Sequence, residues 1–331
     1  MRLTQRAPSA QPIGALRGVP GAQPPSGGRT ACPARVAGGQ AGGGTLGSPI
    51  WERAPSRLIT SPRNARITAI RRLRGQAARD RTGFFLTEGV RFVLKAVEHH
   101  AQIETLIVAP NLLTGTVSRE LVRRLYRADV PRLDVTPAVF AGLSVAERPQ
   151  GVAAVVRQRW ETLDRLRPDD GGTWVALEGI RNAGNLGSII RTCDAAGAVG
   201  VLLVGDTADP HDPVAVRATM GALFAQRLAR ATAAELAAWA RRHGVRLVGA
   251  APAAPLSYRS ASPDGPVVVL LGNEQRGLPP SLQRRCDLLV SIPMAGGADS
   301  LNVSVAAGIL LYHFGLGRGS GLGAGGSASP G

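Results

Sequence analysis

Hydrophobic and polar residues alternate along the chain in blocks of two different periods. In the first half, short aliphatic runs are separated by segments whose apolar residues recur at helical spacing. The expected strands are residues 84–87, 104–108, 132–135 and 152–156, and the expected helices are 90–99, 117–127 and 137–142. This pattern predicts a small α/β domain.

The second half repeats the alternation with longer and more uniformly aliphatic runs. Strands are expected at 173–179, 199–205, 245–250, 267–272 and 288–292, and helices at 186–196, 213–222, 233–243 and 301–314. Nearly continuous aliphatic strands that are separated by helices are typical of a parallel sheet covered on both faces. We therefore expect an α/β fold with a parallel sheet in the C-terminal domain.

Composition divides the chain further. Residues 1–55 are rich in Gly, Pro, Ala and Ser without periodicity, so we expect a disordered basic segment. A transit peptide or a misassigned start codon would give the same composition. The other expected parts are a first domain at 56–156, a linker at 157–172, a second domain at 173–316 and a flexible tail at 317–331.

Positive charge is concentrated ahead of the folded domains. Of the formal net charge of +16, residues 1–51 contribute +5, residues 52–81 contribute +7 and the rest +4. Residues 62–79 place Ile67, Ile70 and Leu73 at helical spacing, which predicts a basic amphipathic helix. We expect its arginines to bind RNA phosphates, although an arginine-rich genome composition is the alternative; they are Arg63, Arg66, Arg71, Arg72 and Arg74.

Several protein classes are disfavoured by the sequence. No apolar run reaches the roughly 18 residues of a membrane span, and no secretory signal is evident. The three cysteines form no CxxC pair, and no Cys/His cluster suggests a metal site. We expect a soluble, cytoplasmic protein that has neither a metal nor a membrane partner.

Three polar, glycine-containing loops follow expected strands, where ligands bind in open α/β sheets. The first contains Asn182 and Asn185 and leads to Arg191. The second contains Gly272, Asn273 and Glu274, and the third ends in Ser300, Leu301 and Asn302. Singly, Asn185 or Ser300 could cap a helix and Arg191 could be a solvated helix residue. No Gly-x-Gly-x-x-Gly turn supports a dinucleotide site.

The three loops resemble the signature motifs of the SpoU (TrmH) family of RNA 2′-O-methyltransferases in the SPOUT superfamily. The matching segments are IRNAGNLGSIIRTCDAAG, LLGNEQRGLP and SIPMAGGADSLNVSVAAG, with HDPVAVRATMGALF (211–224) between the first two. Residues 80–156 are similar to the ribosomal-protein-like substrate-binding domain of many members. The resemblance implies S-adenosylmethionine as cofactor, a trefoil knot in the C-terminal domain and a homodimer.

The resemblance also implies roles for individual residues. The expected catalytic set is Arg191, Asn185, Glu274, Ser300 and Asn302, and the expected cofactor-binding set is Gly272, Ile292, Leu301, Leu270 and Met294. Gly272, Gly296 and Gly297 would let the backbone approach the cofactor closely. Family members are often described with the arginine as general base, but a guanidinium holds its proton tightly. Our hypothesis is that Arg191 binds a phosphate and stabilises the emerging alkoxide, held in place by Glu274 and Asn185.

The substrate is expected to be RNA with an unpaired target nucleotide. The substrate-binding domain ahead of the catalytic domain favours 23S-type ribosomal RNA. A transfer-RNA methyltransferase, or a non-catalytic RNA-binding protein involved in ribosome assembly, remains the alternative at this point.

Overall fold

The structure is a computed structural model that describes residues 58–168 and 172–315. All of these residues belong to one compact unit, Gly47–Gly331. The predicted disordered segment 1–55 and the flexible tail 317–331 lie outside the described residues. Among the helices of the described ranges, none has the length and apolar character that would be needed to cross a membrane.

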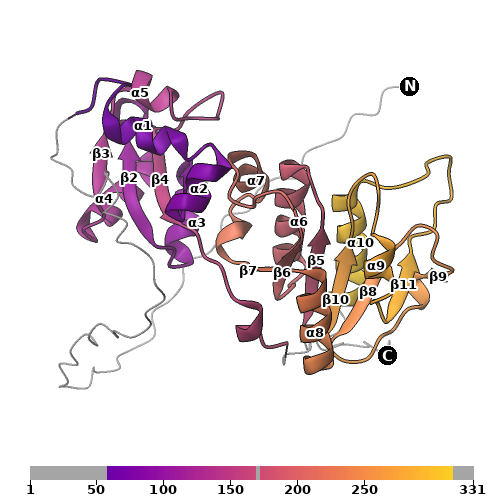
Figure 1. The fold of residues 1–331 in the computed structure, drawn as a ribbon. Helices are drawn as coiled ribbons and strands as arrows, with labels where there is room; N and C mark the ends of the chain where they lie inside the picture. Colours follow the sequence, from indigo (N-terminus) through magenta and orange to yellow (C-terminus); the bar gives the residue numbers. More distant parts are fainter. Residues whose placement is uncertain (1–57, 169–171, 316–331) are drawn as a thin grey trace, which may run out of the picture. The chain divides into compact units, whose positions relative to one another are not determined.

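The first sheet has four strands in the order β1-β4-β2-β3 (Figure 1). β4 pairs antiparallel with β1 and β2, and β3 pairs parallel with β2. The strands are β1 Phe84–Glu88, β2 Ile103–Val108, β3 Arg132–Asp134 and β4 Val152–Arg157. The sequence pattern predicted all four.

Helices cover both faces of this sheet because its strands alternate their side chains between two cores. Phe84 and Leu86 pack with α1 (Ala65–Arg72) and α5 (Pro137–Ala141). Phe85 faces the opposite core, to which α3 (Val90–Glu98) and α4 (Thr116–Arg127) contribute Val93 and Leu121. A short 3₁₀ helix, Pro110–Leu112, follows β2.

The predicted basic helix 62–79 is wrong as a single element. The structure has two helices, α1 and α2 (Gln76–Thr82), separated by Leu73–Gly75. Gly75 has an extended backbone (φ −90°, ψ 136°) and precedes the first residue of α2. Because glycine is a poor helix former, the chain breaks there at low cost.

The second sheet is fully parallel, as predicted, and has seven strands in the order β7-β6-β5-β10-β8-β11-β9. Its strands are β5 Thr173–Glu178, β6 Gly200–Val204, β7 Arg227–Ala231, β8 Arg246–Ala250, β9 Leu256–Ser257, β10 Val267–Leu271 and β11 Leu288–Ser291. β7 and β9, the two edge strands, were not predicted. The strand order does not reveal the knot, which stays a prediction.

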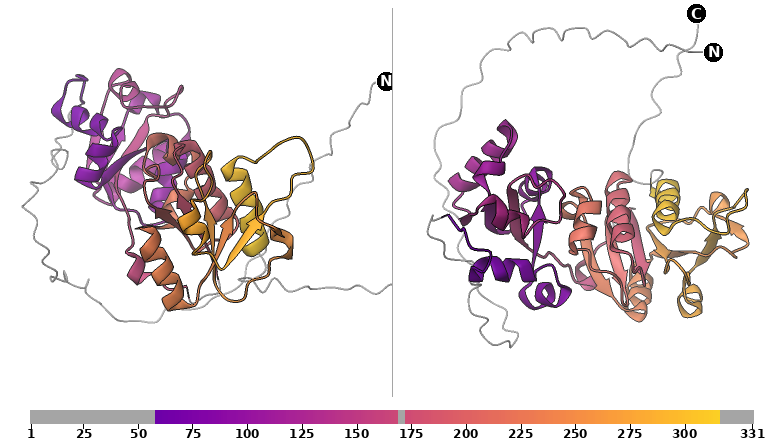
Figure 2. Two further views of the ribbon diagram at one scale, coloured as in Figure 1. Left: turned by 45° about the vertical axis from the view of Figure 1, so that its right-hand side comes forward. Right: turned by 90° about the horizontal axis from the view of Figure 1, so that it is seen from above.

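Helices cover both faces of this sheet (Figure 2). One face packs against α6 (Ala183–Ala195), α7 (Pro213–Ala218) and α10 (Val303–Gly315). The other packs against α8 (Ala233–His243) and α9 (Pro280–Gln283), where Trp239 lies against Trp174. Short 3₁₀ helices occur at Leu163–Arg165, Ala222–Phe224 and Tyr258–Ser260.

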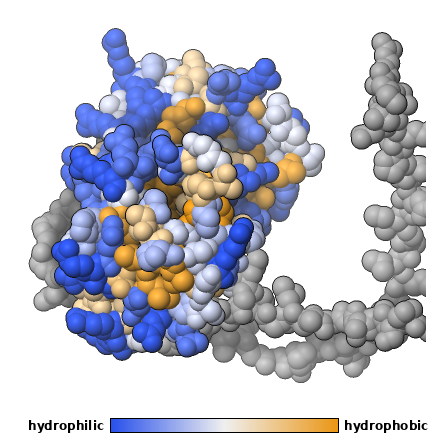
Figure 3. Space-filling view, turned by 90° about the vertical axis from the view of Figure 1, so that its right-hand side faces the viewer, coloured by the Kyte–Doolittle hydropathy of each residue, from blue (hydrophilic) through white to orange (hydrophobic). Residues whose placement is uncertain are grey.

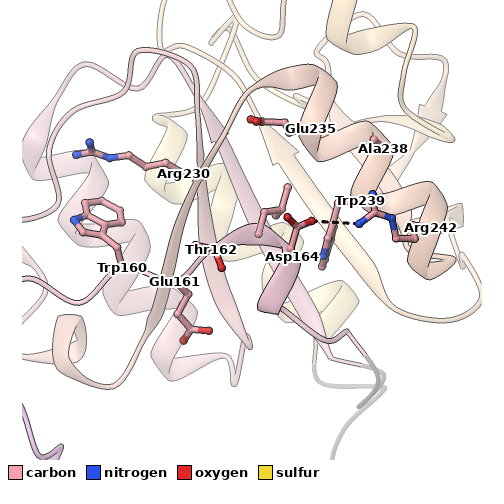
Figure 4. A pocket seen from close by; sticks show the side chains of 10 residues that line it. Trp160, Glu161, Thr162, Asp164, Arg230, Glu235, Ala238, Trp239 and Arg242 are labelled. Carbon is pink, nitrogen blue, oxygen red and sulfur yellow. Dashed lines mark hydrogen bonds and ion pairs between the residues drawn. The ribbon is translucent and has the colours of Figure 1, made fainter. Parts of the chain in front are cut away.

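Part of the predicted linker runs beside the edge strand β7. The Glu161 amide donates to the Leu228 carbonyl (2.8 Å), and the Glu161 carboxylate pairs with Arg227 (2.7 Å). A cavity of about 410 Å³ separates this segment from α8, and Asp164 reaches across to Arg242 (Figure 4). The described part of the linker therefore packs along the edge of the sheet.

A buried ionic network joins α2 to the loop after β6. Arg79 Nε lies 2.6 Å from Asp209 Oδ2, and both side chains are at most 3% exposed. Arg79 Nη1 also donates to the carbonyls of Leu73 and Arg74, at the end of α1. One guanidinium therefore donates hydrogen bonds to the carbonyls between the two helices and pairs with a carboxylate of the second domain. Asp212 also lies 3.5 Å from Arg79.

Candidate active site

The three polar loops converge beyond the carboxyl ends of the parallel strands. The loop after β5 leads into α6, the loop after β10 starts at Gly272, and the loop after β11 leads into α10. β5 and β10 are neighbours in the sheet, with Leu177 opposite Leu271. Adjacent strands that end at the same edge bring the first two loops together.

Asn185 connects all three loops. Its side-chain amide nitrogen donates to Glu274 Oε1 (3.2 Å), and its oxygen accepts a hydrogen bond from Asn302 Nδ2 (3.2 Å). The three residues lie 89 and 117 positions apart in the chain. The structure therefore brings Asn185, Glu274 and Asn302 together, three of the five residues in the predicted catalytic set.

Glu274 is fixed by hydrogen bonds to the start of α6. Its carboxylate accepts from the backbone amides of Arg181 (3.3 Å) and Asn182 (3.2 Å) as well as from Asn185. Partial burial opposes the charged form. However, these bonds and that from its own amide outweigh burial and hold the pKa of Glu274 below its usual range. Glu274 is thus an anion at neutral pH, held at the positive end of a helix.

The helix caps are Asn182 and Asn302, and not Asn185 or Ser300, which the sequence left open as caps. The cap of α6 is Asn182, whose Oδ1 accepts from the Asn185 amide (3.0 Å). At α10, Asn302 Oδ1 accepts from the Ser304 amide (2.8 Å) and hydroxyl (2.6 Å). Asn302 therefore both starts α10 and binds Asn185. Ser300 is exposed two residues earlier and is not the cap.

Glu274 and Asn185 do not contact Arg191 in this structure, so their predicted support of its guanidinium stays a prediction. Arg191 is exposed on α6. No hydrogen bond or ion pair joins Arg191 to another residue within 58–168 or 172–315. Arg191 lies six positions after Asn185, which corresponds to about 9 Å along the helix axis. Glu274 is already engaged at the first turn, so its carboxylate pairs with the asparagine there.

Packing within the protein constrains Gly272, whereas its predicted approach to the cofactor stays a prediction. A Cβ atom at this position would lie 2.2–2.3 Å from backbone atoms of Gly277 and Leu278. The space beside Gly272 is therefore filled by the returning loop, where Asn273 and Gly277 form a β-bridge. Gly296 and Gly297, in contrast, have no atom within 4 Å of such a Cβ.

Asn273 is a site residue that the candidate set omitted. Its Nδ2 donates to the Gly179 carbonyl (2.7 Å), and its Oδ1 accepts from the amides of Gln275 and Arg276. It therefore ties the loop after β10 to the end of β5. An amide residue directly after a buried strand and a glycine was the available signal.

The predicted cofactor residues occupy two environments. The Leu270 side chain is fully buried in the core of the second domain, between Ala176 and Gly249 of the flanking strands. Ile292 packs partly against the other core. Met294 and Leu301 are 38% and 37% exposed. Among the predicted cofactor residues, the two with exposed apolar side chains, Met294 and Leu301, therefore belong to the loop after β11.

Metal-ligating groups do not gather at this site. In the described part of the chain, no three residues of the types His, Cys, Asp and Glu are placed to hold a metal ion together. The side chains that do meet are amides and one carboxylate, which can orient a polar substrate through hydrogen bonds.

Two family models match the chain. Residues 172–312 match the SpoU rRNA Methylase family, and residues 64–154 match the MRM3-like substrate binding domain. These matches, which include all three polar loops, confirm the resemblance inferred from the motifs.

Individual relatives match over most of their length. The 23S rRNA (uridine(2479)-2′-O)-methyltransferase of Streptomyces viridochromogenes is 35% identical over 79% of this chain and 93% of that protein. The 23S rRNA (guanosine(2553)-2′-O)-methyltransferase RlmP of Bacillus subtilis (strain 168) is 28% identical over 77% and 98%. The AdoMet-bound rRNA methyltransferase from Sinorhizobium meliloti superposes with a TM-score of 0.72, 38% identity and coverage of 78% and 97%.

Proposed function

Because the chain belongs to the SpoU rRNA methylase family, we propose that it transfers a methyl group from S-adenosylmethionine to a ribose 2′-hydroxyl of 23S-type ribosomal RNA. The observation that carries this proposal is the hydrogen-bonded set Glu274–Asn185–Asn302, which unites the three motif loops. Ribosomal RNA is preferred because two relatives that match most of this chain are named 23S rRNA 2′-O-methyltransferases.

The loop after β11 suits the proposed cofactor. No atom lies within 4 Å of a Cβ placed on Gly296 or Gly297, so their backbone can approach a ligand. Met294 and Leu301 offer apolar surface, and the hydrogen-bonding groups of Gly272 and Ile292 lie at the ends of β10 and β11. When bound, S-adenosylmethionine supplies a methyl group that is activated by a sulfonium charge. Leu270 supports this region from the core and touches no ligand with its side chain.

Arg191 is the proposed residue that touches the RNA nucleophile. It is exposed and has no acidic partner among residues 58–168 and 172–315, so its guanidinium is available to an anion. A guanidinium has no acceptor and keeps its proton, which favours electrostatic stabilisation over general-base catalysis. We assign it to the phosphate beside the target ribose and to the charge that develops on the 2′-oxygen. Ser300, exposed beside Asn302, would orient the ribose.

The remaining parts of the proposal concern the roles of the domains, the knot and the location of the protein. We assign residues 56–156 to RNA binding, residues 157–172 to the linker and residues 173–316 to catalysis. Arg63, Arg72 and Arg74 are exposed, and Arg66 and Arg71 are half-buried, so all five keep some access to phosphates. The trefoil knot that the resemblance implies and a cytoplasmic location also belong to this proposal.

A homodimer is supported by apolar residues on the outer side of α10. Val305 and Tyr312 are 50% and 48% exposed. Figure 3 shows several apolar patches on the side of the molecule that carries β9. A second copy of the chain would remove such patches from water, which is favourable in proportion to the apolar area buried.

The test is methyl transfer from labelled S-adenosylmethionine to separate pools of ribosomal and transfer RNA. We expect label in 23S rRNA at one position that resists alkali, because 2′-O-methylation blocks cleavage of that linkage. Arg191→Ala should reduce transfer by at least about 100-fold, since losing one stabilising donor of a developing oxyanion costs 10²–10³ in rate.

Two further variants sharpen this test. Arg165→Ala removes another exposed arginine and should retain activity. Arg191→Lys should recover little, because an ammonium lacks the planar fork of donors. Near-full activity of Arg191→Lys would reject the guanidinium role, and label in transfer RNA alone would reject the substrate assignment.

A further inference from the structure

A basic cavity lies at the end of the parallel sheet opposite the active-site loops. It has a volume of about 570 Å³ and lies between the end of α8, the start of β8 and the residues after α9. Its charged lining consists of Arg241, Arg246, Arg284, Arg285 and Asp287. We call it the arginine pocket. Arg246 is the first residue of β8 and Asp287 precedes β11, so the pocket is at the amino ends of strands whose carboxyl ends face the active-site loops.

The arginine pocket has more positive charge than its own acid can neutralise. Asp287 accepts hydrogen bonds from Arg246 Nη1 (3.2 Å) and from the Leu247 amide (2.8 Å). Within the described part of the chain, Arg241, Arg284 and Arg285 form no ion pair, and all three are exposed. Three uncompensated guanidinium groups therefore share one concavity.

Local structure explains only part of this charge. Arg241 lies in the last turn of α8, where a cation offsets the negative end of the helix dipole. Arg284 and Arg285 follow a helix of four residues, whose dipole is too small to require two cations. The remaining lining includes Ala237, Ala240 and Val245, so no carboxylate other than Asp287 would repel an incoming anion.

Phosphate groups of RNA fit this arrangement. Guanidinium groups bind phosphate in a bidentate manner, and several of them at spacings set by a rigid scaffold can follow a nucleic-acid backbone. A β-strand of five residues spans roughly 15 Å, so one folded RNA can reach from the active-site loops to the amino ends of the strands. The arginine pocket also lies outside both the predicted basic helix region and the three motif loops.

We propose that the arginine pocket is a second RNA-binding site, which holds backbone phosphates of the ribosomal RNA substrate at the end of the catalytic domain opposite the methyl-transfer site. This assignment rests on the proposed function for the identity of the RNA. The pocket supplies affinity without reading sequence, and it favours a large folded RNA over a short one.

The test compares two double variants of the full chain that change the net charge equally. Arg284→Glu/Arg285→Glu reverses the pocket, and Arg165→Glu/Arg167→Glu reverses two exposed arginines of the linker. Equilibrium binding to an unmodified 23S rRNA transcript is measured at several salt concentrations, together with KM, kcat and the Kd for S-adenosylmethionine.

For the pocket variant we expect the Kd for RNA to rise at least tenfold more than for the linker variant. The slope of log Kd against log salt should also fall by about 1 to 2, since each lost phosphate contact releases about one counterion fewer. The value of kcat at saturating RNA and the Kd for S-adenosylmethionine should stay unchanged. Equal RNA affinity of the two variants would overturn the proposal.

Two further measurements keep the result unambiguous. If the charge reversal impairs folding, Arg284→Gln/Arg285→Gln replaces it and should weaken RNA binding in the same direction. Thermal stabilisation of the wild type by inorganic phosphate, with RNA affinity unaffected in the variant, would assign the pocket to free phosphate and overturn the RNA assignment. Absent methyl transfer in the wild type would reject the proposed function, whereas the RNA-binding comparison would still decide the role of the pocket.

Discussion

Gly272 and Gly296 show how differently two glycines of one candidate site can be constrained. Backbone atoms of the returning loop fill the position where Gly272 would carry a Cβ, whereas the same position at Gly296 is open. Neither glycine has a positive φ, so the space around the residue sets the constraint. The loop that carries Glu274 can therefore pack in this way only if residue 272 has no side chain.

We predict that Gly272→Ala destabilises the protein strongly and that Gly296→Ala does not. A methyl group placed 2.2–2.3 Å from backbone atoms forces the loop to move. Overpacking of this kind costs typically about 1–3 kcal/mol. Urea unfolding of both variants measures the difference, and methyl transfer should also fall in Gly272→Ala because Glu274 would shift. Equal stability of Gly272→Ala and the wild type would show that the loop rearranges freely.

The candidate residues illustrate what a sequence can and cannot predict about a site. The carboxyl ends of parallel strands share one edge of a sheet, so a meeting of the three polar loops was expected from the predicted sheet and motifs. The strand order, in which β8 separates β10 from β11, was not predicted. The hydrogen-bond partner of Glu274 was not predictable in this way, because it depends on which turn of α6 the carboxylate reaches, and the sequence pattern does not show this. Glu274 binds the first turn of the helix, and Arg191 projects from a later turn.

At the scale of elements, the loop after β6 is anchored by the buried pair of Arg79 and Asp209. Burial opposes ionisation of Asp209, but hydrogen bonds from His211 and Arg79 outweigh it and hold the pKa of this carboxyl far below its usual range. Burial in turn lowers the pKa of His211, which favours the neutral ring at pH 7. The Asp209 carboxylate is therefore charged at neutral pH.

We predict that Asp209→Asn lowers the free energy of unfolding by about 3 kcal/mol at pH 7, because the buried Arg79 charge loses its nearer carboxylate and keeps only Asp212, at 3.5 Å. A carboxyl whose pKa is lowered by folding stabilises the protein above its unfolded value and loses this contribution as the pH falls towards the folded value. The difference in free energy of unfolding between the wild type and Asp209→Asn should therefore become smaller as the pH falls from 5 to 2.

Urea unfolding at several pH values checks this prediction, with Asp164→Asn as the control. Asp164 pairs with Arg242 at 3.2 Å, but both side chains are largely exposed, so its loss should have little effect. If the difference in free energy of unfolding between the wild type and Asp209→Asn does not change with pH, the predicted coupling between folding and ionisation of Asp209 is wrong.

The two strands that the sequence missed have different physical causes. β7 has the sequence Arg227–Ala231, RLARA, in which two arginines interrupt the aliphatic pattern. At the edge of the sheet these arginines are accommodated, since Arg227 pairs with Glu161 and Arg230 stacks on Trp160. The central strands, buried on both faces, kept the continuous pattern and were predicted. β9 has only two residues, too few for any periodicity.

At the scale of the whole molecule, the exposed apolar residues of α10 lead to a prediction about assembly. We expect the wild type to sediment as a dimer, and Val305→Glu/Tyr312→Glu to sediment as a monomer because two charges would be buried in the interface. Val117→Glu, at a 63% exposed position of α4, should leave the dimer intact. Analytical ultracentrifugation measures this directly, and a monomeric wild type would reject the dimer.

The long sequence separations within the candidate site also bear on protein synthesis. The Asn302–Asn185 hydrogen bond joins residues 117 positions apart, and Asn302 stands at the start of the last described helix. At a translation rate of about 5–20 residues per second, roughly 6–23 s pass between the synthesis of the two residues. A nascent chain therefore has no complete site until α10 is made.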